Sequence, residues 1–396
     1  MDLRIGIGFS QEENIVRATE IAAEQAKDQI GKKRIDLAIL LTTPDYNPEE
    51  VIPIAASALN QTRIIGGTTC GIITPAGLKR HGISILAMNS DTIGIDPVHT
   101  DHLNLKNMEA AGSSFIHSSL SGFGQKERKL LFFFFDGLLE NMSDFTKGIA
   151  KKAGVFFPTI ALGTSDQFTF SKTHQYRDNC ANTHSACGMV LGGDINFYMA
   201  ARHGWKPLGR PRLVKKSKKN IIEQIGEAPA IQIYEEFFKD SLGSLKNDTF
   251  GKLNARYPLG IFTKHKEEYL LRNVTDILED GSIVLQDEIP DKAEIHIMIA
   301  NKASCLHSAV EAAEALKKQL GNQTPKGLLI FESAMRWRVL KHSWNQERAA
   351  IMHVLGKGFP IFGMMTYGEM FNSGTIVNAP GRNYLLNGNI LLVAII

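Results

Sequence analysis

Residues 360–370 read Pro-Ile-Phe-Gly-Met-Met-Thr-Tyr-Gly-Glu-Met, an apolar strand that leads directly into the carboxylate of Glu369. A second apolar run, residues 388–396, closes the chain and predicts another strand. An unpaired charge beside a core costs several kcal/mol, so we expect Glu369 to meet a partner or a ligand. The stretch therefore predicts a buried sheet with a polar group at the end of one strand.

Strand and helix patterns alternate through the first part of the chain. Apolar runs at residues 4–9, 35–41 and 63–69 predict strands with helices between them. Ser10 and Glu13 have the spacing of a capping box before the first helix. The result is a β-α-β-α-β opening. The strongly apolar run 129–135, Lys-Leu-Leu-Phe-Phe-Phe-Phe, predicts a strand that is buried on both faces.

Hairpin patterns then replace the alternation. Residues 167–176 predict a strand and residues 228–238 a helix. The pair Asp280-Gly281 predicts a tight turn between strands at 269–278 and 282–285. We therefore expect an α+β fold, with two α/β-type halves whose mixed, largely antiparallel sheets are flanked by helices.

The length of 396 residues favours two domains, because single cores stop growing at roughly 250 to 300 residues. The basic stretch 210–219 marks the change in pattern. We therefore expect a first domain at residues 1–222 and a second at 223–396.

Composition excludes several classes of partner. The chain has 44 lysines and arginines against 41 acidic residues, a net charge of +3, and the basic stretch has no interleaved aromatic residues, so we expect no nucleic-acid partner. No apolar run reaches the roughly 18 to 20 residues of a membrane span, and no secretory signal pattern opens the chain. Four cysteines in this length do not form a disulfide framework. We expect a soluble, cytoplasmic protein without a membrane partner.

Five short motifs follow one another in the chain: Gly-Gly-Thr-Thr-Cys-Gly at 66–71, Arg-His-Gly-Trp-Lys-Pro-Leu-Gly at 202–209, Tyr-Pro-Leu-Gly-Ile at 257–261, Leu-Leu-Arg at 270–272 and Tyr-Gly-Glu at 367–369. In this order they resemble the FIST family, over about residues 30 to 390. The resemblance implies a sensory module, with an N-terminal and a C-terminal half, that binds small ligands such as amino acids. It also implies, for some members, haem-binding sensors of nitric oxide that partner a histidine kinase. The sequence has no fused kinase segment, so we expect a separate signalling partner.

Six residues are candidates for contact with a small ligand. Thr68 and Thr69 follow a strand in a glycine-rich bend, where backbone N–H groups and hydroxyls bind anions or simply turn the chain. Arg272 and Arg336 suit a ligand carboxylate, and the alternative for each is internal pairing with Glu369 or Asp287. Tyr367 lies on the same side of its strand as Glu369, so the two side chains suit one ligand, or else a hydrogen-bonded strand end.

Histidines and cysteines gather between residues 174 and 187, but their spacing fits no standard zinc pattern, so we expect no metal. Haem needs only one axial ligand in an apolar pocket, and His184 and His203 are the candidates, ahead of His174.

Three functions remain open at this point. The first is a non-enzymatic sensor of a small ligand, an amino acid or related metabolite. The second is a haem-binding nitric-oxide sensor that regulates a histidine kinase. The third is an enzyme that uses the glycine-rich bend as an anion site.

Overall fold

The computed structural model describes residues 3–117, 119, 127–238, 257–262, 269–290, 292–372 and 385–396. Its first unit is a sheet covered by two helices. The sheet has the order β1 (Arg4–Ser10), β6 (Ile83–Asn89), β2 (Leu37–Thr42), β3 (Ile64–Thr68). Strands β2 and β3 are parallel, while β6 is antiparallel to both of its neighbours. Helices α1 (Ile15–Ile30) and α2 (Pro48–Ala58) pack an alanine-rich face on the sheet.

The same strand order occurs in two further units. The second has β7 (Ile93–Thr100), β12 (Ala186–Gly193), β8 (Arg128–Phe135) and β9 (Thr159–Gly163), with α3 (Met108–His117) and α5 (Met142–Ala153) outside. The third has β13 (Phe197–Arg202), β25 (Ile390–Ile395), β22 (Gly327–Ser333) and β23 (Ile361–Thr366), with α9 (Lys302–Leu320) and α11 (Trp344–Leu355) outside. In both units the last two strands are parallel.

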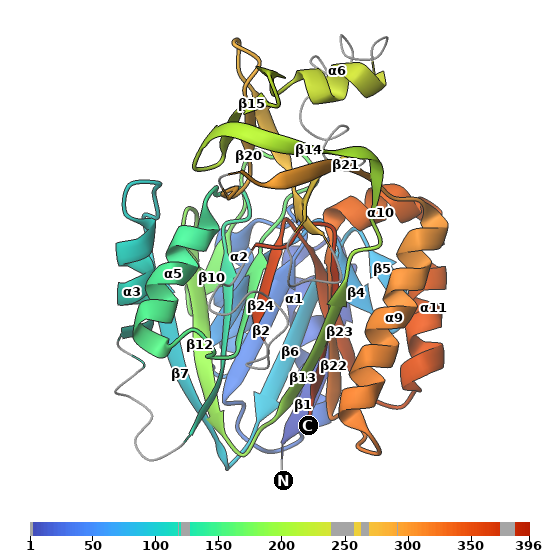
Figure 1. The fold of residues 1–396 in the computed structure, drawn as a ribbon. Coiled ribbons are helices and arrows are strands. Elements are labelled where there is room, and N and C mark those ends of the chain that lie inside the picture. Colours follow the sequence, from blue (N-terminus) through green and yellow to red (C-terminus); the bar gives the residue numbers. More distant parts are fainter. Residues whose placement is uncertain are drawn as a thin grey trace.

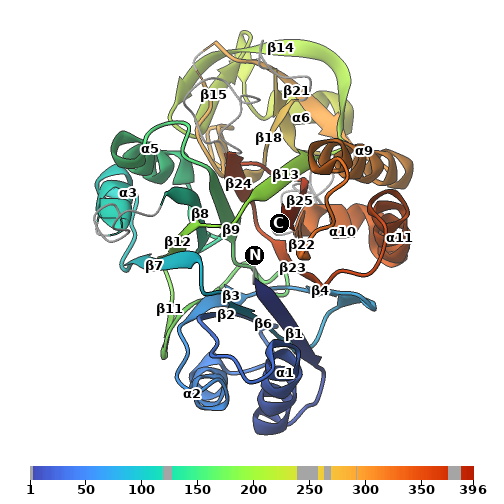
Figure 2. The same ribbon diagram turned by 90° about the horizontal axis from the view of Figure 1, so that it is seen from below.

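The three units interlock by exchanging the segment that follows the last strand. Strands β4 (Ile72–Thr74) and β5 (Gly77–Lys79) leave the first unit as a hairpin, and β4 pairs with β23. Strands β10 (Gln175–Arg177) and β11 (Cys180–Asn182) leave the second unit as a hairpin, and β10 pairs with β3. Strand β24 (Glu369–Asn372) leaves the third unit and pairs with β9. Figure 2 shows the resulting prism, with three sheets around one axis and a pair of helices outside each.

A single apolar core fills the prism, and the run Phe132–Phe135 shows how the sequence builds it. Side chains alternate across a strand, so Phe132 and Phe134 enter the central core while Phe133 and Phe135 pack under α3 and α5. All four are buried, as the sequence predicts.

A cap covers one end of the prism (Figure 1). It is inserted between β13 and α9 and contains β14 (Lys206–Lys218), β15 (Ile221–Ile225), β16 (Ala228–Pro229), α6 (Gln232–Phe238), β17 (Leu259–Ile261), β18 (Leu270–Arg272), β19 (Val274–Ile277), β20 (Ile283–Leu285) and β21 (Glu294–Ile299). Acidic residues of the cap pair with part of the basic stretch, as in Arg212 with Glu236 at 2.7 Å.

The structure confirms the α+β class, with mixed sheets flanked by helices, and the hairpin of β19 and β20. The two predicted domains share a sheet, because β4 pairs with β23. The boundary at 222 and 223 lies inside β15 and stays a prediction. In the described part of the chain, no helix is long and apolar enough to cross a membrane.

Three local predictions are wrong. The first helix is capped by Asn14, whose side chain accepts the N–H of Arg17 at 3.0 Å, because β1 continues to Ser10 and delays the helix. The predicted helix at 228 begins at Gln232, because β16 pairs with β15 first. The predicted strand at 167–176 is mostly a loop, because the backbone N–H groups of residues 169–171 donate hydrogen bonds to Asp166.

Candidate functional site

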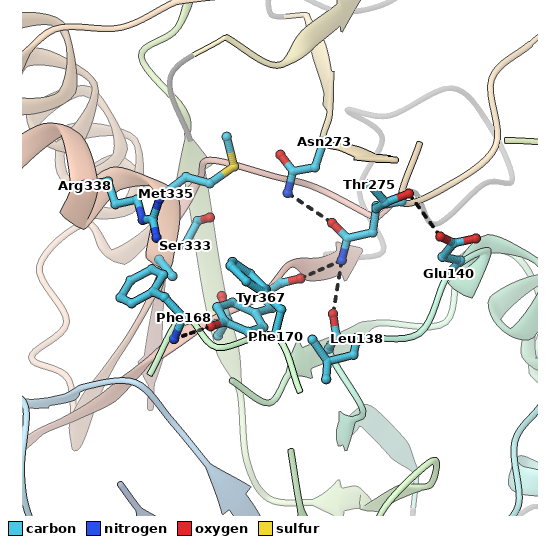
Figure 3. Close-up of a pocket in the computed structure, with 14 residues that line it drawn as sticks. Leu138, Glu140, Phe168, Phe170, Asn273, Thr275, Ser333, Met335, Arg338 and Tyr367 are labelled. Carbon is cyan, nitrogen blue, oxygen red and sulfur yellow. Dashed lines mark hydrogen bonds between the residues drawn. The ribbon is translucent and has the colours of Figure 1, made fainter. Parts of the chain in front are cut away.

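A cavity of about 240 Å³ lies between the cap and the covered end of the prism. The prism contributes residues that follow the carboxyl ends of β8, β9, β22 and β23, and the cap contributes residues from the β18–β20 region (Figure 3). The lining residues are Gly137, Leu138, Glu140, Phe168, Phe170, Asn273, Thr275, Gln286, Ser333, Ala334, Met335, Arg338, Thr366 and Tyr367. A concave site with apolar walls and a few polar groups is the usual form of a small-molecule site.

Three aromatic side chains form one wall of the cavity. Phe170 stacks on Tyr367 with ring centroids 4.9 Å apart, and Phe168 lies 6.2 Å from Tyr367. Phe168 and Phe170 have positive φ angles of 66° and 51°. Bulky side chains rarely adopt this conformation, which persists only where surrounding contacts enforce it and is concentrated at functional sites.

Asp166 supplies those contacts. Its carboxylate accepts the Thr169 N–H at 3.0 Å, the Phe170 N–H at 3.1 Å, the Ser171 N–H at 2.9 Å and the Tyr367 hydroxyl at 2.7 Å. Burial raises the pKa of this carboxyl, but the hydrogen bonds from Thr169, Ser171, Tyr367 and Phe170 outweigh burial and lower the pKa overall. These bonds gather the backbone after Asp166 into a loop, and for that reason it is not a strand.

The cap closes the cavity with amides. Gln286 donates to the carbonyl of Tyr367 at 2.9 Å and accepts the amide groups of Asn273 at 3.1 Å and Asn387 at 2.9 Å. The other amide atom of Asn273, Oδ1, is buried and has no hydrogen-bond partner among the described residues. A buried acceptor of this kind calls for a water or a ligand.

Two charged side chains line the cavity. The guanidinium of Arg338, from α10 (Ala334–Leu340), lies over the Phe168 ring at 4.6 Å. Glu140 accepts the Thr275 hydroxyl at 3.0 Å and the Asn220 amide at 2.9 Å. The cavity thus combines an aromatic wall with a cation and an anion.

Of the six predicted ligand-binding residues, Tyr367 lines the cavity. Thr68 and Thr69 are buried outside it and face backbone: Thr68 Oγ1 accepts the His174 N–H at 3.0 Å, and Thr69 Oγ1 lies 2.7 Å from the carbonyl of Met365. Here the glycine-rich bend joins strand ends of the three units.

Arg272 and Arg336 are fully buried and make internal bonds. Arg272 donates to the carbonyls of Leu385 at 2.7 Å and Glu288 at 3.1 Å, and pairs with Asp287 at 3.8 Å. The bond to Leu385 joins the cap to the prism, while Glu288 and Asp287 belong to the cap itself.

Arg336 forms the centre of a second buried cluster, between β22, α9 and α11. It donates to the carbonyls of His203 at 2.5 Å and Cys305 at 2.9 Å, pairs with Glu347, and lies 3.8 Å from Glu332. Arg272 thus pairs with Asp287, one of the two internal partners considered from the sequence, whereas Arg336 pairs internally with Glu347, which was not one of them.

Glu369 is fully buried beside the cavity wall, where it accepts the hydroxyl of the lining residue Thr366. Its second oxygen has no partner among the described residues. Burial raises the pKa of Glu369 well above its usual value, although Thr366 and Arg336 act in the opposite direction.

This raised pKa predicts an effect of pH on stability. The unfolded state releases the Glu369 proton above a pKa of about 4.3, whereas the folded state still holds it there. Stability therefore falls as pH rises from the unfolded pKa toward the raised folded pKa. Glu369→Gln lacks the titration. We expect this variant to exceed the parent in free energy of unfolding by about 1 to 3 kcal/mol at pH 8 and by less at pH 5. Urea unfolding at both pH values measures the difference; a variant that is less stable than the parent at pH 8 would contradict the assignment.

The predicted axial ligands for haem do not lie on the cavity. His184 is exposed on the turn before β12, and His203 is buried with Nδ1 accepting the N–H of Trp205 at 2.9 Å. Both residues therefore lie outside the lining of this cavity, and haem binding by either one stays a prediction. Within the described ranges, no cluster of histidine, cysteine and acidic side chains has the geometry of a metal site.

Sequence reasoning missed Asp166, Arg338, Glu140 and Gln286. One signal was present: Leu162-Gly163-Thr164-Ser165-Asp166 ends an apolar strand in small polar residues, as 66–71 does.

Comparison with known families finds two matches that together span most of the chain. The FIST N domain matches residues 36–228, and the FIST C domain matches residues 230–372. No curated protein matches the sequence.

Similarity to solved structures is weak. A cyanuric acid hydrolase from A. caulinodans has 8% identity and a TM-score of 0.39, with coverage of 100% of this chain and 99% of that one. Phosphoribosylformylglycinamidine synthase II from Thermotoga maritima has 9% identity and a TM-score of 0.23, with coverage of 100% and 72%. Neither similarity carries an argument about fold or activity.

Proposed function

Since this chain belongs to the FIST family, whose two domains it matches in order, we propose that it is a sensory module that binds a small ligand in the cavity between cap and prism. FIST domains are linked to signal transduction and small-ligand sensing. The observation that carries the proposal is the cavity itself, where the loop held by Asp166 presents a strained aromatic wall opposite the polar cap.

The chemistry of the lining supports an amino acid or a related metabolite as the ligand. A guanidinium binds carboxylates, and a carboxylate binds ammonium groups. Arg338 and Glu140 provide both. The volume of about 240 Å³ suits a molecule of metabolite size, somewhat below the range of drug-sized sites.

We propose binding without catalysis. The catalytic alternative depends on the hydroxyls of Thr68 and Thr69, and these lie outside the cavity and face backbone groups.

Signal output is proposed to follow from the position of the cap. A ligand that contacts both Tyr367 of the prism and Asn273 of the cap favours one arrangement of the two. A separate signalling protein, such as a histidine kinase, would recognise that arrangement of cap and prism. The four cysteines are free, which supports a reducing compartment such as the cytoplasm.

A thermal-shift screen of amino acids and related metabolites, with calorimetry on the hits, tests the proposal. Leu138→Trp is expected to fill the cavity and lower the affinity of each hit by tenfold or more, a loss of about 1.4 kcal/mol or greater. Leu105→Trp is the control, because Leu105 is 53% exposed and does not line the cavity. Hits that bind Leu138→Trp as tightly as the parent, or a screen without hits, would contradict the proposal.

A further inference from the structure

A second pocket lies in the first unit, at the end of the prism away from the cap. It is formed by residues 31–36, which join α1 to β2, and residues 59–63, which join α2 to β3. Arg4, at the start of β1, donates to the carbonyl of Ile30 at 3.3 Å, so the end of α1 lies beside the start of the first strand. Figure 1 marks the N-terminus at the end opposite the cap. This pocket is therefore remote from the cavity under the cap.

Positive charge is concentrated around this basic pocket, whose volume is about 450 Å³. The whole chain has a net charge of only +3. The charged residues that line the basic pocket are Lys27, Lys32, Lys33, Arg34, Arg63 and one carboxylate, Asp36. Five cations against one carboxylate need further partners, either within the protein or from a ligand.

Three of the five cations have partners within the protein. Lys27 donates to the carbonyl of the last residue of α2 at 2.9 Å, where the helix dipole favours a cation. Lys33 pairs with Asp91 at 3.3 Å. Arg34 pairs with Asp36 at 3.0 Å. A helix end and two carboxylates therefore account for these three charges.

Lys32 and Arg63 are the two cations that remain. Both are exposed, and neither side chain has a hydrogen bond or an ion pair within the described part of the chain. Lys32 follows the end of α1 and Arg63 precedes β3, so the two segments that form the basic pocket contribute one cation each. Like charges at one pocket repel each other, and an anion with a charge near −2 would remove that repulsion.

A phosphate group matches this charge. A phosphate monoester carries about −1.5 to −2 at pH 7 and has three strong acceptor oxygens. A guanidinium binds phosphate through two parallel N–H bonds, and a lysine ammonium binds it as a point charge. Arg63 and Lys32 supply one group of each kind. A carboxylate brings a single charge and would leave one of these two cations without a partner.

The rest of the lining suits a polar body rather than a flat ring. Asn60, Gln61 and Thr62 bring amide and hydroxyl groups to the basic pocket. None of the described residues that line it is aromatic, so it has no ring on which a nucleotide base would stack. The volume leaves room for more than the phosphate itself.

We propose that the basic pocket binds a phosphorylated metabolite with a non-aromatic, hydroxyl-bearing body, whose phosphate contacts Lys32 and Arg63. This site is separate from the cavity under the cap, so the inference goes beyond the proposed function.

Isothermal calorimetry on the whole chain tests the inference with three probes: glucose 6-phosphate, inorganic phosphate and glucose. The salt concentration is kept low, at about 50 mM, because surface charges are screened as salt rises. We expect glucose 6-phosphate to bind most tightly. Inorganic phosphate is expected to bind about tenfold more weakly, since it lacks the hydrogen bonds of the sugar hydroxyls. Glucose, which lacks the charge, is expected to show no measurable binding.

Two variants identify the cations that hold the phosphate. Lys32→Gln and Arg63→Gln are each expected to weaken the binding of glucose 6-phosphate about tenfold, and the double variant is expected to remove measurable binding. Lys318→Gln is the matched control, because Lys318 is an exposed lysine in the last turn of α9 and does not line the basic pocket. Its affinity should equal that of the parent. Urea unfolding checks that all the variants fold.

Four results would overturn the inference. The first is that no phosphate compound binds, and the second is that glucose 6-phosphate binds the double variant as tightly as the parent. The third is an equal loss in Lys318→Gln, which would show only a general effect of surface charge. The fourth is that inorganic phosphate binds as tightly as glucose 6-phosphate, which would exclude a role for the metabolite's body.

The variant that fills the cavity separates this inference from the proposed function. Glucose 6-phosphate is expected to bind Leu138→Trp as tightly as the parent, and a loss in that variant would place the compound in the cavity and overturn the inference. Compounds that bind in the cavity are expected to bind the Lys32 and Arg63 variants as they bind the parent. Failure of either proposal therefore leaves the other intact.

Discussion

Arg336→Met is expected to lower the free energy of unfolding by about 3 to 5 kcal/mol, because removal of one partner from a buried ion pair leaves the other charge unpaired. Glu347 and Glu332 both face this guanidinium, and all three side chains are buried. Burial raises the pKa of Glu332 well above its usual value even with the arginine present.

The cost is expected to depend on pH. Arg336 favours the ionised form of Glu332, so its stabilising effect is greatest where Glu332 ionises and shrinks as this carboxyl protonates. The loss in Arg336→Met should therefore be smaller at pH 5 than at pH 8.

Arg338→Met is a matched control on the same helix. Arg338 is only partly buried, and a partly exposed charge contributes about 1 kcal/mol or less. Urea unfolding of both variants measures the contrast. Equal losses in the two variants, or a loss below about 1 kcal/mol in Arg336→Met, would show that the cluster does not stabilise the third unit.

Asp166→Ala is expected to abolish measurable binding of every cavity ligand and to cost about 2 to 4 kcal/mol of stability, since each buried donor left without an acceptor costs about 1 to 3 kcal/mol. The variant leaves the N–H groups of Thr169, Phe170 and Ser171 without their acceptor. The positive φ angles at Phe168 and Phe170 then have nothing to enforce them.

Hydrogen exchange locates this effect. The amides of residues 169–171 are expected to exchange faster in Asp166→Ala, while those of the central strands β8 and β22 stay protected. Asp194→Ala is the control, because Asp194 is exposed in the turn before β13. Unchanged protection at 169–171 together with unchanged ligand affinity would contradict the role given to Asp166.

The sequence predicts those parts of the fold that depend on local pattern. The run Phe132–Phe135 is apolar at every position, so its burial on both faces follows from composition. The exchange of β4, β10 and β24 between units does not follow, because strand partners far apart in the chain are chosen by packing and register rather than by local pattern.

For the site, the sequence predicts the region but not the side chains. Tyr367 was predicted, but its hydroxyl partner Asp166 lies 201 residues earlier, and no local signal connects them. Arg336 and Arg338 lie two positions apart on one helix, about 200° around its axis at 3.6 residues per turn. One faces the buried carboxylates and the other the cavity, and only the packing of α10 decides which.

The central claim, that the cavity under the cap is a receptor site, is tested most directly by a crystal structure grown with the tightest-binding compound from the thermal-shift screen. The account predicts density for that compound between Tyr367 and Asn273, in contact with both prism and cap. Density for the compound elsewhere on the protein, with this cavity filled only by water, would contradict it.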